Sequence, residues 1–335
     1  MHGQSNVNPA RLLCAGFDGL EVPAEFQDVL DRGIGGVILF SRNAGTPDQV
    51  RDLCLELRRR SPGPLVICID QEGGRCQRLV DGFNRIPSME EVGRNGLDEV
   101  RRIAGLIADD LIDVGIDLDL APVVDVNSNP DNPVIGSRSF GADPSLVSSA
   151  AAEFIGVMQS RGISACAKHF PGHGDTDLDS HHDLPVLAHD MERLRQIELP
   201  PFKTAIKAGV RAVMTAHVLM ERLDHEHPAT LSPSIIKSIL RSELGYDGLV
   251  ISDDLEMKAI ADRYPLPEAA LLAVEAGVDL LLCCHEHESQ LAIIDALEEA
   301  VHSGRLSSSS ISRSIERIDG ILMHQPDDDA TGSRG

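Results

Sequence analysis

The stretch ISACAKHFPGHGDTDLDSHHDLPVL, residues 163–187, joins a short apolar run to a strongly polar loop. The apolar run covers 163–167, and the twenty residues after it hold four His, four Asp and two Gly. Polar side chains at this density cannot all be buried with hydrogen-bond partners, so chemistry explains them better than packing does. The stretch therefore predicts a buried strand that ends in a functional loop.

The same alternation continues along the whole chain, because short β-branched runs are separated by longer segments of helical period. Near-continuous apolar strands joined through helices predict a parallel sheet covered on both faces, and eight such units predict a closed (β/α)8 barrel of the TIM type. We expect this α/β barrel to be a single domain over residues 1–324, followed by a disordered acidic tail over 325–335. The expected strands are 12–16, 36–40, 65–70, 117–123, 164–169, 212–217, 249–253 and 278–283.

Several helices between these strands have recognisable ends. Apolar residues at positions 100, 103, 104, 107, 111 and 114 trace one helical face, and Gly115 fits the C-terminal stop. Ser232 and Pro233 are expected as the N-cap and first residue of another helix, which ends before Gly245. A helix over 308–322 is expected to complete the barrel.

Composition excludes some classes of partner. The chain has 335 residues and a formal net charge of −23, and either nucleic acid or an anionic membrane surface would need a basic face. The first residues lack the basic and apolar regions of an export signal, and no run of about 18 apolar residues occurs anywhere. Seven cysteines without a C-x-x-C pair fit reduced, buried thiols. We expect a cytoplasmic protein without membrane insertion.

Polar residues follow five of the eight expected strands. In a parallel barrel the reactive groups gather at the carboxyl ends of the strands, so these residues are expected to meet at one end of the barrel. They are Asp70 to Arg78, Asp125 to Arg138, Lys168 with His169, Thr215 to His217, and Ser252 to Asp254.

Two metal patterns in the polar loop fail on their details. The alternating Asp175, Asp177 and Asp179 resemble the start of an EF-hand loop, but the turn glycine and the bidentate glutamate of that loop are missing. His169 and His173 have the spacing of a zinc-binding pair, but the Pro-Gly between them precludes the helix that makes this spacing useful. We therefore expect no calcium, no zinc and no cofactor.

Six motifs together carry a family resemblance. They resemble glycoside hydrolase family 3, and more narrowly the single-domain bacterial β-N-acetylhexosaminidases of cell-wall recycling. The resemblance spans residues 12–322. The motifs are DQEGGR-x-QR at 70–78, IG-x-RSFG at 135–141, KHFPGHGDT-x-x-DSH at 168–181, TAHV at 215–218, PATLS at 228–232 and SDDLEM at 252–257.

This resemblance implies a retaining exo-glycosidase on a (β/α)8 barrel that releases terminal β-linked N-acetylglucosamine. Carried over by position, the catalytic roles fall on Asp253 as nucleophile, His181 as acid/base and Asp179 as the partner of His181. The sugar-contact positions fall on Asp70, Arg78, Arg138, Lys168 and His169.

The residues alone support the same chemistry. A retaining glycosidase needs a carboxylate nucleophile and a group that first donates and later accepts a proton. Asp253 ends an apolar strand and suits a fixed nucleophile. His181 qualifies as proton donor because imidazole titrates near neutral pH, and Asp179 can orient it by accepting its other N–H. His182 is the competing candidate, and the glycines of the loop allow the pair to be positioned only when substrate binds.

Some alternatives stay open at this point. The cations Arg78, Arg138 and Lys168 either form a sugar pocket or make structural salt bridges, and both roles are compatible. The acidic partners expected for such bridges are Asp70, Glu72 and Asp125.

Three other functions also remain. A metal-dependent barrel hydrolase would use His169, His173 and His181 as ligands, and a catalytically silent barrel would only bind sugar. Within the family, phosphate instead of water could accept the sugar, or the sugar could differ. The substrate is expected to be a saccharide or muropeptide ending in N-acetylglucosamine. Its aglycone and the oligomeric state are left open by the sequence.

Overall fold

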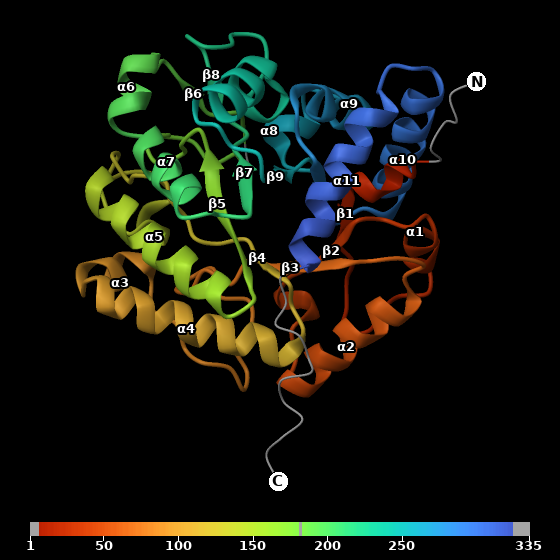
Figure 1. The fold of residues 1–335 in the computed structure, drawn as a ribbon, viewed down its shortest axis with the longest axis horizontal. Coiled ribbons are helices and arrows are strands. Elements are labelled where there is room, and N and C mark those ends of the chain that lie inside the picture. Colours follow the sequence, from red (N-terminus) through yellow and green to blue (C-terminus); the bar gives the residue numbers. More distant parts are fainter. Residues whose placement is uncertain (1–6, 181–182, 324–335) are drawn as a thin grey trace.

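The computed structural model describes residues 7–180 and 183–323, which form a closed barrel of eight parallel strands surrounded by helices (Figure 1). Neighbouring strands follow the order β1-β2-β3-β4-β5-β7-β9-β10, and β10 pairs with β1 to close the barrel. The predicted (β/α)8 fold is confirmed. The strands are β1 Leu13–Ala15, β2 Gly36–Leu39, β3 Val66–Ile69, β4 Leu118–Asp119, β5 Ser164–Phe170, β7 Ala212–Thr215, β9 Leu249–Asp254 and β10 Leu280–Cys283.

Each predicted strand matches one observed strand, although most observed strands are shorter at their ends. A further sheet was not predicted. In it β6 (Val186–Leu187) pairs in parallel with β8 (Leu219–Met220), which ties the loop after β5 to the loop after β7. Two-residue strands carry too few side chains for a periodic pattern, so the sequence gives no signal for them.

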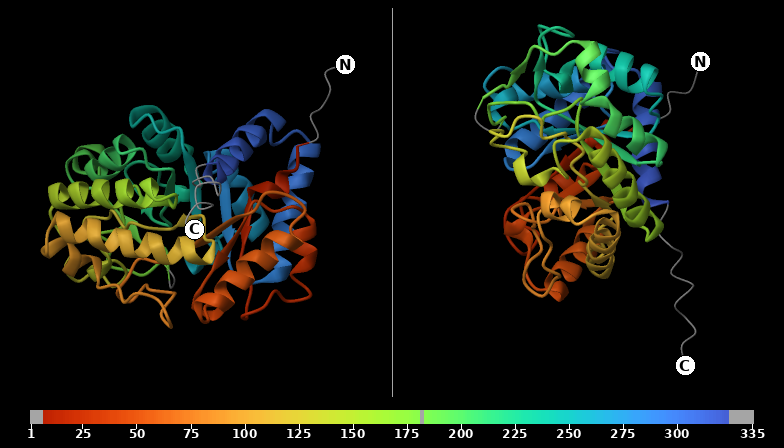
Figure 2. Two further views of the ribbon diagram at one scale, coloured as in Figure 1. Left: turned by 60° about the horizontal axis from the view of Figure 1, so that its bottom comes forward. Right: turned by 90° about the vertical axis from the view of Figure 1, so that its left-hand side faces the viewer.

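Helices surround the strands in the two views of Figure 2. The α-helices are α1 Gln27–Asp31, α2 Pro47–Arg60, α3 Met89–Arg94, α4 Leu97–Val114, α5 Pro144–Ser160, α6 Met191–Gln196, α7 Leu199–Lys207, α8 Lys258–Ala261, α9 Leu266–Ala276, α10 His287–His302 and α11 Ser308–Leu322. Shorter 3-10 turns are η1 Pro9–Leu12, η2 Ser41–Asn43, η3 Gly136–Arg138 and η4 Ala229–Leu231, and η5 Ser234–Glu243 is a π-helix. None of the helices in the described part of the chain has the length and apolar content needed to cross a bilayer.

Local chemistry sets several helix ends. In α2, Thr46 and Gln49 form a reciprocal capping box, and each side chain satisfies a main-chain N–H of the other. Helix α4 buries the predicted apolar face and ends at Gly115, whose φ of 80° is the left-handed conformation that glycine adopts without strain. The helix predicted after Ser232 is the π-helix η5, so the expected N-cap is one residue early; Ser232 Oγ still accepts the N–H of Ile235 at 3.3 Å.

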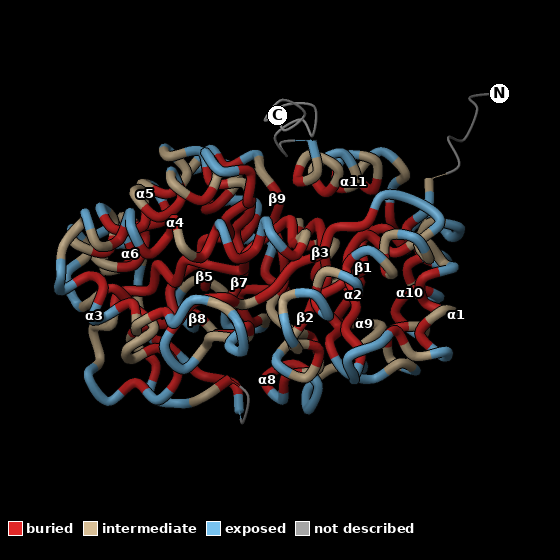
Figure 3. The backbone as a smooth tube through the Cα atoms, turned by 90° about the horizontal axis from the view of Figure 1, so that it is seen from below, coloured by how far each residue is buried: buried red, intermediate tan, exposed pale blue. Residues whose placement is uncertain are grey.

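The barrel strands are buried, as the red backbone of Figure 3 shows. Their side chains alternate between two faces and so form two core layers. In β9, for example, Val250 belongs to the layer packed against the helices, whereas Ile251 faces the barrel interior. The interior layer includes Ile38, Cys68, Leu118, Leu120, Cys166, Met214, Ile251 and Leu282. Burial of each fully buried aliphatic side chain contributes roughly 1.5–3 kcal/mol to the free energy of unfolding. All seven cysteines are free, and all but Cys76 are buried, as predicted.

Candidate active site

A cavity of about 170 Å³ opens at the carboxyl ends of the barrel strands. Six of the predicted site residues line it: Asp70, Arg78, Arg138, Lys168, His169 and Asp253. The other lining residues are Ile38, Phe40, Glu72, Cys76, Leu120, Val134, His173, Ser180, Met214, Asp254, Met257, Leu282, Cys284 and His285. The predicted Asp179 lies on the neighbouring loop and does not line the cavity, and His181 and His182 lie outside the described residues.

A register irregularity explains why two consecutive residues of β5 reach this cavity. Ala167 pairs with Val213 of β7, but Phe170 pairs with Thr215, so three residues of β5 advance against two of β7. A bulge of this kind re-aims side chains that would otherwise alternate between two faces. Lys168 and His169 accordingly both line the cavity, and the peptide bond between them is cis.

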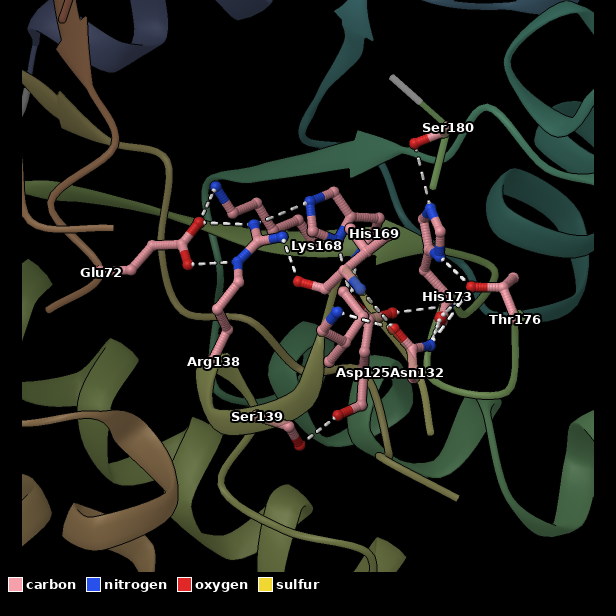
Figure 4. Close-up of polar contacts among 12 residues, drawn as sticks. Glu72, Asp125, Asn132, Arg138, Ser139, Lys168, His169, His173, Thr176 and Ser180 are labelled. Atoms are coloured by element: carbon pink, nitrogen blue, oxygen red, sulfur yellow. Dashed lines mark hydrogen bonds and ion pairs between the residues drawn. The ribbon is translucent and has the colours of Figure 1, made fainter. Parts of the chain in front are cut away.

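Lys168 joins a compact cluster of buried and half-buried charges, of which Figure 4 labels Glu72, Arg138 and Lys168. Its Nζ lies 2.6 Å from both Asp70 Oδ1 and Glu72 Oε1. Arg138 donates from Nε and Nη2 to the two oxygens of Glu72, both at 2.7 Å. Arg78 Nη2 is 3.5 Å from Asp70 Oδ2. The predicted cations therefore form salt bridges and line the cavity at the same time.

Pairing keeps this cluster charged despite its burial. Burial alone would disfavour the Glu72 carboxylate, but Arg138 and Lys168 hold its pKa well below the usual range. In return, the carboxylates raise the pKa of Arg138 and Lys168 above their ordinary values against the same burial. Glu72, Arg138 and Lys168 are therefore all charged at neutral pH.

Asp125 does not join the cationic cluster, contrary to the expectation that it pairs with those cations. Its Oδ2 lies 2.7 Å from His169 Nδ1 and also accepts the main-chain N–H of His169, while Oδ1 accepts the N–H of His173 at 2.7 Å. Burial opposes its charge, but His169 keeps the Asp125 pKa below its ordinary value. An ionised Asp125 accepts a hydrogen bond from Nδ1–H of His169. The other ring nitrogen of His169, Nε2, lies 3.4 Å from Arg138 Nη2.

His173 is a structural link that the sequence analysis treated only as a possible metal ligand. Its Nδ1 lies 2.7 Å from Thr176 Oγ1, and this hydroxyl donates to the His173 carbonyl, so Nδ1 carries the proton. Nε2 then accepts from Ser180 Oγ at 3.2 Å. Burial and the neighbouring His169 lower the His173 pKa to about 4, so the ring is neutral at neutral pH.

Ser180 and Asp183 fasten the chain on both sides of residues 181–182. The carbonyl of Ser180 accepts the N–H of Ala259 in α8 at 3.3 Å, and Asp183 pairs with Arg263 at 2.7 Å. The residues on either side of 181–182, where the predicted acid/base His181 lies, are therefore bound to the segment that follows Asp253 in the chain.

The metal-ligand alternative finds no support in these contacts. Both ring nitrogens of His169 and of His173 face hydrogen-bond partners within the protein. Within residues 7–180 and 183–323, no group of three or more His, Cys, Asp or Glu side chains has an arrangement that could hold a metal ion.

Asp253 and Asp254 occupy the end of β9, where a second bulge lies. Ile251 pairs with Leu280 of β10, but Asp254 pairs with Leu282, so β9 advances three residues against two. As in β5, the bulge lets two consecutive side chains line the cavity. The main-chain N–H of Asp254 donates to Asp253 Oδ1 at 2.8 Å, which fixes the Asp253 carboxyl.

His217, from the predicted polar end of β7, supports this strand end from outside the cavity. Its Nε2 is 2.9 Å from the carbonyl of Asp254 and its Nδ1 is 2.8 Å from Thr230 Oγ1. His217 of the TAHV motif therefore contacts Thr230 of the PATLS motif, and it also holds the main chain of β9 at Asp254.

Comparison with known protein families is consistent with this arrangement. The model of the glycosyl hydrolase family 3 N-terminal domain matches residues 20–321. The chain belongs to this family. The β-hexosaminidase of Stenotrophomonas maltophilia strain K279a is 37% identical over 323 residues, covering 93% of this chain and 94% of that protein. The β-hexosaminidase of Methylococcus capsulatus is 40% identical over 273 residues, covering 80% and 81%.

Solved structures of family 3 proteins share the fold. The β-N-acetylglucosaminidase of Paenibacillus sp. FPU-7 superimposes with a TM-score of 0.92 at 42% identity; the match covers 98% of this chain but only 63% of that longer protein. The β-N-acetylhexosaminidase of Beutenbergia cavernae superimposes with a TM-score of 0.88 at 26% identity, covering 93% of this chain and 96% of that one. The resemblance inferred from the six motifs is confirmed at the level of the family.

Asp119 of β4 gives a stability prediction near the site. It is fully buried; Oδ1 accepts the N–H of Gln71 at 2.9 Å, and Oδ2 has no hydrogen-bond partner among the described residues. Burial raises its pKa to about 8. Below about pH 4 the carboxyl is protonated in both the folded and the unfolded state. Between about pH 4 and 8 only the unfolded state loses the proton, so stability falls as pH rises, by on the order of 5 kcal/mol.

Asp119→Asn is therefore expected to raise the unfolding temperature relative to wild type progressively from pH 5 to pH 8, because the amide accepts from Gln71 and does not titrate. Thermal unfolding at a series of pH values measures this difference. The exposed Asp113→Asn serves as the matched control and should follow wild type throughout. A constant difference between Asp119→Asn and wild type at every pH would contradict a titrating buried carboxyl.

Proposed function

We propose that the protein is a retaining exo-β-N-acetylglucosaminidase that works through a covalent glycosyl–Asp253 intermediate, with His181 and Asp179 as the acid/base pair. The coarser assignment, a family 3 glycoside hydrolase of the β-hexosaminidase type, rests on the family match and on relatives aligned over most of their length. The observation that carries the finer proposal is the position of Asp253. Asp253 lies near the carboxyl end of β9 and lines the cavity together with Asp70, Arg138 and Lys168.

The proposed reaction has two balanced steps. In the first, Asp253 attacks the anomeric carbon while the bond to the leaving oxygen breaks, and that oxygen takes a proton from His181. In the second, His181 removes a proton from water, the water oxygen bonds to the anomeric carbon, and the bond to Asp253 breaks. Asp179 accepts the second N–H of the imidazole and stabilises its protonated form.

The charges of the cavity suit a neutral sugar. Three cations, Arg78, Arg138 and Lys168, face the carboxylates of Asp70, Glu72 and Asp253 across the same space. Because charged groups of both signs line the cavity, the hydroxyls of a neutral sugar find both donors and acceptors. Asp70 and Lys168 pair at 2.6 Å, so one hydroxyl can accept from the ammonium and donate to the carboxylate.

The substrate is proposed to be a peptidoglycan fragment, a muropeptide that ends in N-acetylglucosamine. This part rests on the resemblance of the six motifs to the enzymes of cell-wall recycling. The relatives support this sugar, since they are named a β-hexosaminidase and a β-N-acetylglucosaminidase. Water is the proposed acceptor, and phosphorolysis or another terminal sugar remain the alternatives.

A panel of aryl β-glycosides that differ only in the sugar tests the sugar and the reaction class. We expect turnover of the N-acetylglucosaminide to exceed that of the glucoside and galactoside by at least about a hundredfold, because the missing acetamido group leaves its contacts unmade. Release of N-acetylglucosamine from muropeptides then tests the aglycone. Sugar 1-phosphate among the products in phosphate buffer would establish phosphorolysis, and equal turnover of all sugars would contradict the proposal.

The cationic cluster gives a direct test of sugar binding. Arg138→Ala is expected to raise KM and lower kcat/KM by roughly 10- to 100-fold, the effect of losing one charge-assisted hydrogen bond. It should also lower the free energy of unfolding by roughly 3–5 kcal/mol, because Glu72 loses a buried partner. Steady-state kinetics and urea unfolding measure the two effects.

Lys168→Ala is expected to show the same pattern, and Arg101→Ala is the control, since Arg101 pairs with Glu153 on the surface. A lower unfolding free energy with unchanged kinetics for both Arg138→Ala and Lys168→Ala would mean that the cluster is structural only.

A further inference from the structure

Asp254 is a second carboxyl in the cavity that the proposed mechanism does not use. Its side chain is 14% exposed and lines the same space as Asp253. Oδ1 accepts the main-chain N–H of Glu256 at 3.1 Å and that of Cys284 at 3.3 Å. Oδ2 lies 3.6 Å from Nε2 of His285. One oxygen is therefore held by the backbone, and the other faces an imidazole.

His285 lies between Asp254 of β9 and Phe40, which follows β2. It follows β10, and its ring stacks on Phe40 at the end of β2, with centroids 6.0 Å apart and planes inclined by 28°. Its main-chain N–H donates to Glu256 Oε2 at 2.6 Å. Phe40, Asp254 and His285 all line the cavity, and the imidazole is 51% exposed. The ring is positioned by a stack on one side and by a carboxyl on the other.

The surroundings of Asp254 favour its protonated form. Burial and the neighbouring Glu256 carboxylate raise the Asp254 pKa to about 7. The nearby thiols are neutral because burial raises the pKa of both. Arg42 and Arg78 lie over the Phe40 ring, at 4.3 and 5.6 Å from its centroid. The titratable groups that face Asp254 are Asp253, His217, Glu256, Cys283, Cys284 and His285.

We propose that Asp254, with His285 facing its free oxygen, positions Asp253, and that loss of the Asp254 proton slows glycosyl transfer to Asp253. This inference rests on the proposed function. The main-chain N–H of Asp254 holds Asp253 Oδ1, and a neutral Asp254 side chain adds no like charge beside the nucleophile. Once ionised, Asp254 repels the carboxylates of Asp253 and Glu256 and so disturbs the position of Asp253. Asp254 acts through these neighbours, so it is a positioning residue.

The pH profile of the first chemical step tests this pair. An aryl N-acetylglucosaminide with a good leaving group needs no protonation, so the proton donor contributes no alkaline limb to its single-turnover rate. In the wild-type protein we expect this rate to fall on the alkaline side with a midpoint near pH 7, since Asp254 keeps its proton below that pH and loses it above.

Asp254→Asn keeps an oxygen for the two main-chain N–H groups but has no proton to lose. We expect its alkaline limb to disappear or to move up by at least about one pH unit. His285→Gln, which removes the facing imidazole, should shift the limb as well. Asp262→Asn and His302→Gln, both exposed, are the matched controls and should keep the wild-type profile.

An unchanged alkaline limb in Asp254→Asn would overturn the inference. If that variant does not fold, His285→Gln decides alone, and an unshifted limb in it has the same meaning. Failure of the proposed function is a separate result, because the wild-type protein would then show no turnover of the N-acetylglucosaminide at any pH.

Discussion

Asp253→Ala is expected to lower kcat/KM by at least roughly a thousandfold, since the variant has no carboxylate to form the covalent bond. Folding should be retained, because Asp253 sits at the half-buried end of a strand whose apolar residues carry the packing. Steady-state kinetics together with thermal unfolding measure both effects. Asp262→Asn, which changes an exposed carboxyl outside the cavity, should keep the wild-type rate.

Asp254, the neighbouring carboxyl, is the alternative nucleophile to Asp253. Residual turnover above about 1% of wild type in Asp253→Ala, far more than loss of a covalent nucleophile leaves, would transfer the nucleophile role to Asp254. The structure argues against that role, because Asp254 Oδ1 is engaged by two main-chain N–H groups and its raised pKa keeps it protonated below about pH 7.

His181→Ala is expected to have an effect that depends on the leaving group. If His181 protonates the leaving oxygen, substrates with good leaving groups keep much of their first-step rate, whereas natural glycosides lose roughly 10²- to 10⁴-fold. The defect should therefore grow as the aglycone becomes more basic. Rates of glycosyl transfer to the enzyme, measured over a series of aryl aglycones, give this dependence directly.

Two further variants complete the test of the proton donor. Asp179→Asn should show the same trend more weakly, because it removes the charge that supports the imidazolium but leaves the ring in place. His182→Ala is the control and should stay near wild type. If His181→Ala slows good and poor leaving groups equally in the first step, His181 is not the general acid and the loop acts in binding only.

The fold could be predicted from the sequence because its signal repeats eight times. Each barrel strand is an apolar run such as Val66–Ile69, and each is followed by a helical segment, so strand order and parallel pairing follow from simple rules. Strand ends were less accurate, since backbone pairing stops before the apolar pattern does. The β6–β8 pairing depends on contacts between two distant loops, which no local pattern records.

The residues that make up the site could be predicted better than the hydrogen bonds and ion pairs between them. Because carboxyl ends of parallel strands meet, Asp70, Arg138, Lys168 and Asp253 could be placed in one cavity from their positions alone. The pairing of Asp125 with His169 instead of a cation could not, since it depends on which side chain reaches which atom. The bulges in β5 and β9 also lie beyond sequence patterns, although each puts two consecutive residues into the cavity.

The segment that follows Asp253 contacts the polar loop on both sides of residues 181–182. Ser180 accepts the N–H of Ala259 in α8, and Asp183 pairs with Arg263, two residues beyond the end of α8. The loop expected to carry the proton donor and the strand that carries the nucleophile are therefore fastened to one segment.

Trapping the covalent glycosyl–Asp253 intermediate tests the proposed mechanism directly. The protein is incubated with a fluorinated N-acetylglucosaminyl substrate that slows the second step, then digested and analysed by peptide mass spectrometry. The account predicts one glycosyl adduct on the peptide that contains Ser252 to Met257, with fragmentation placing it on Asp253, and no adduct in Asp253→Ala. An adduct on Asp254, or turnover of the substrate without any adduct, would contradict it.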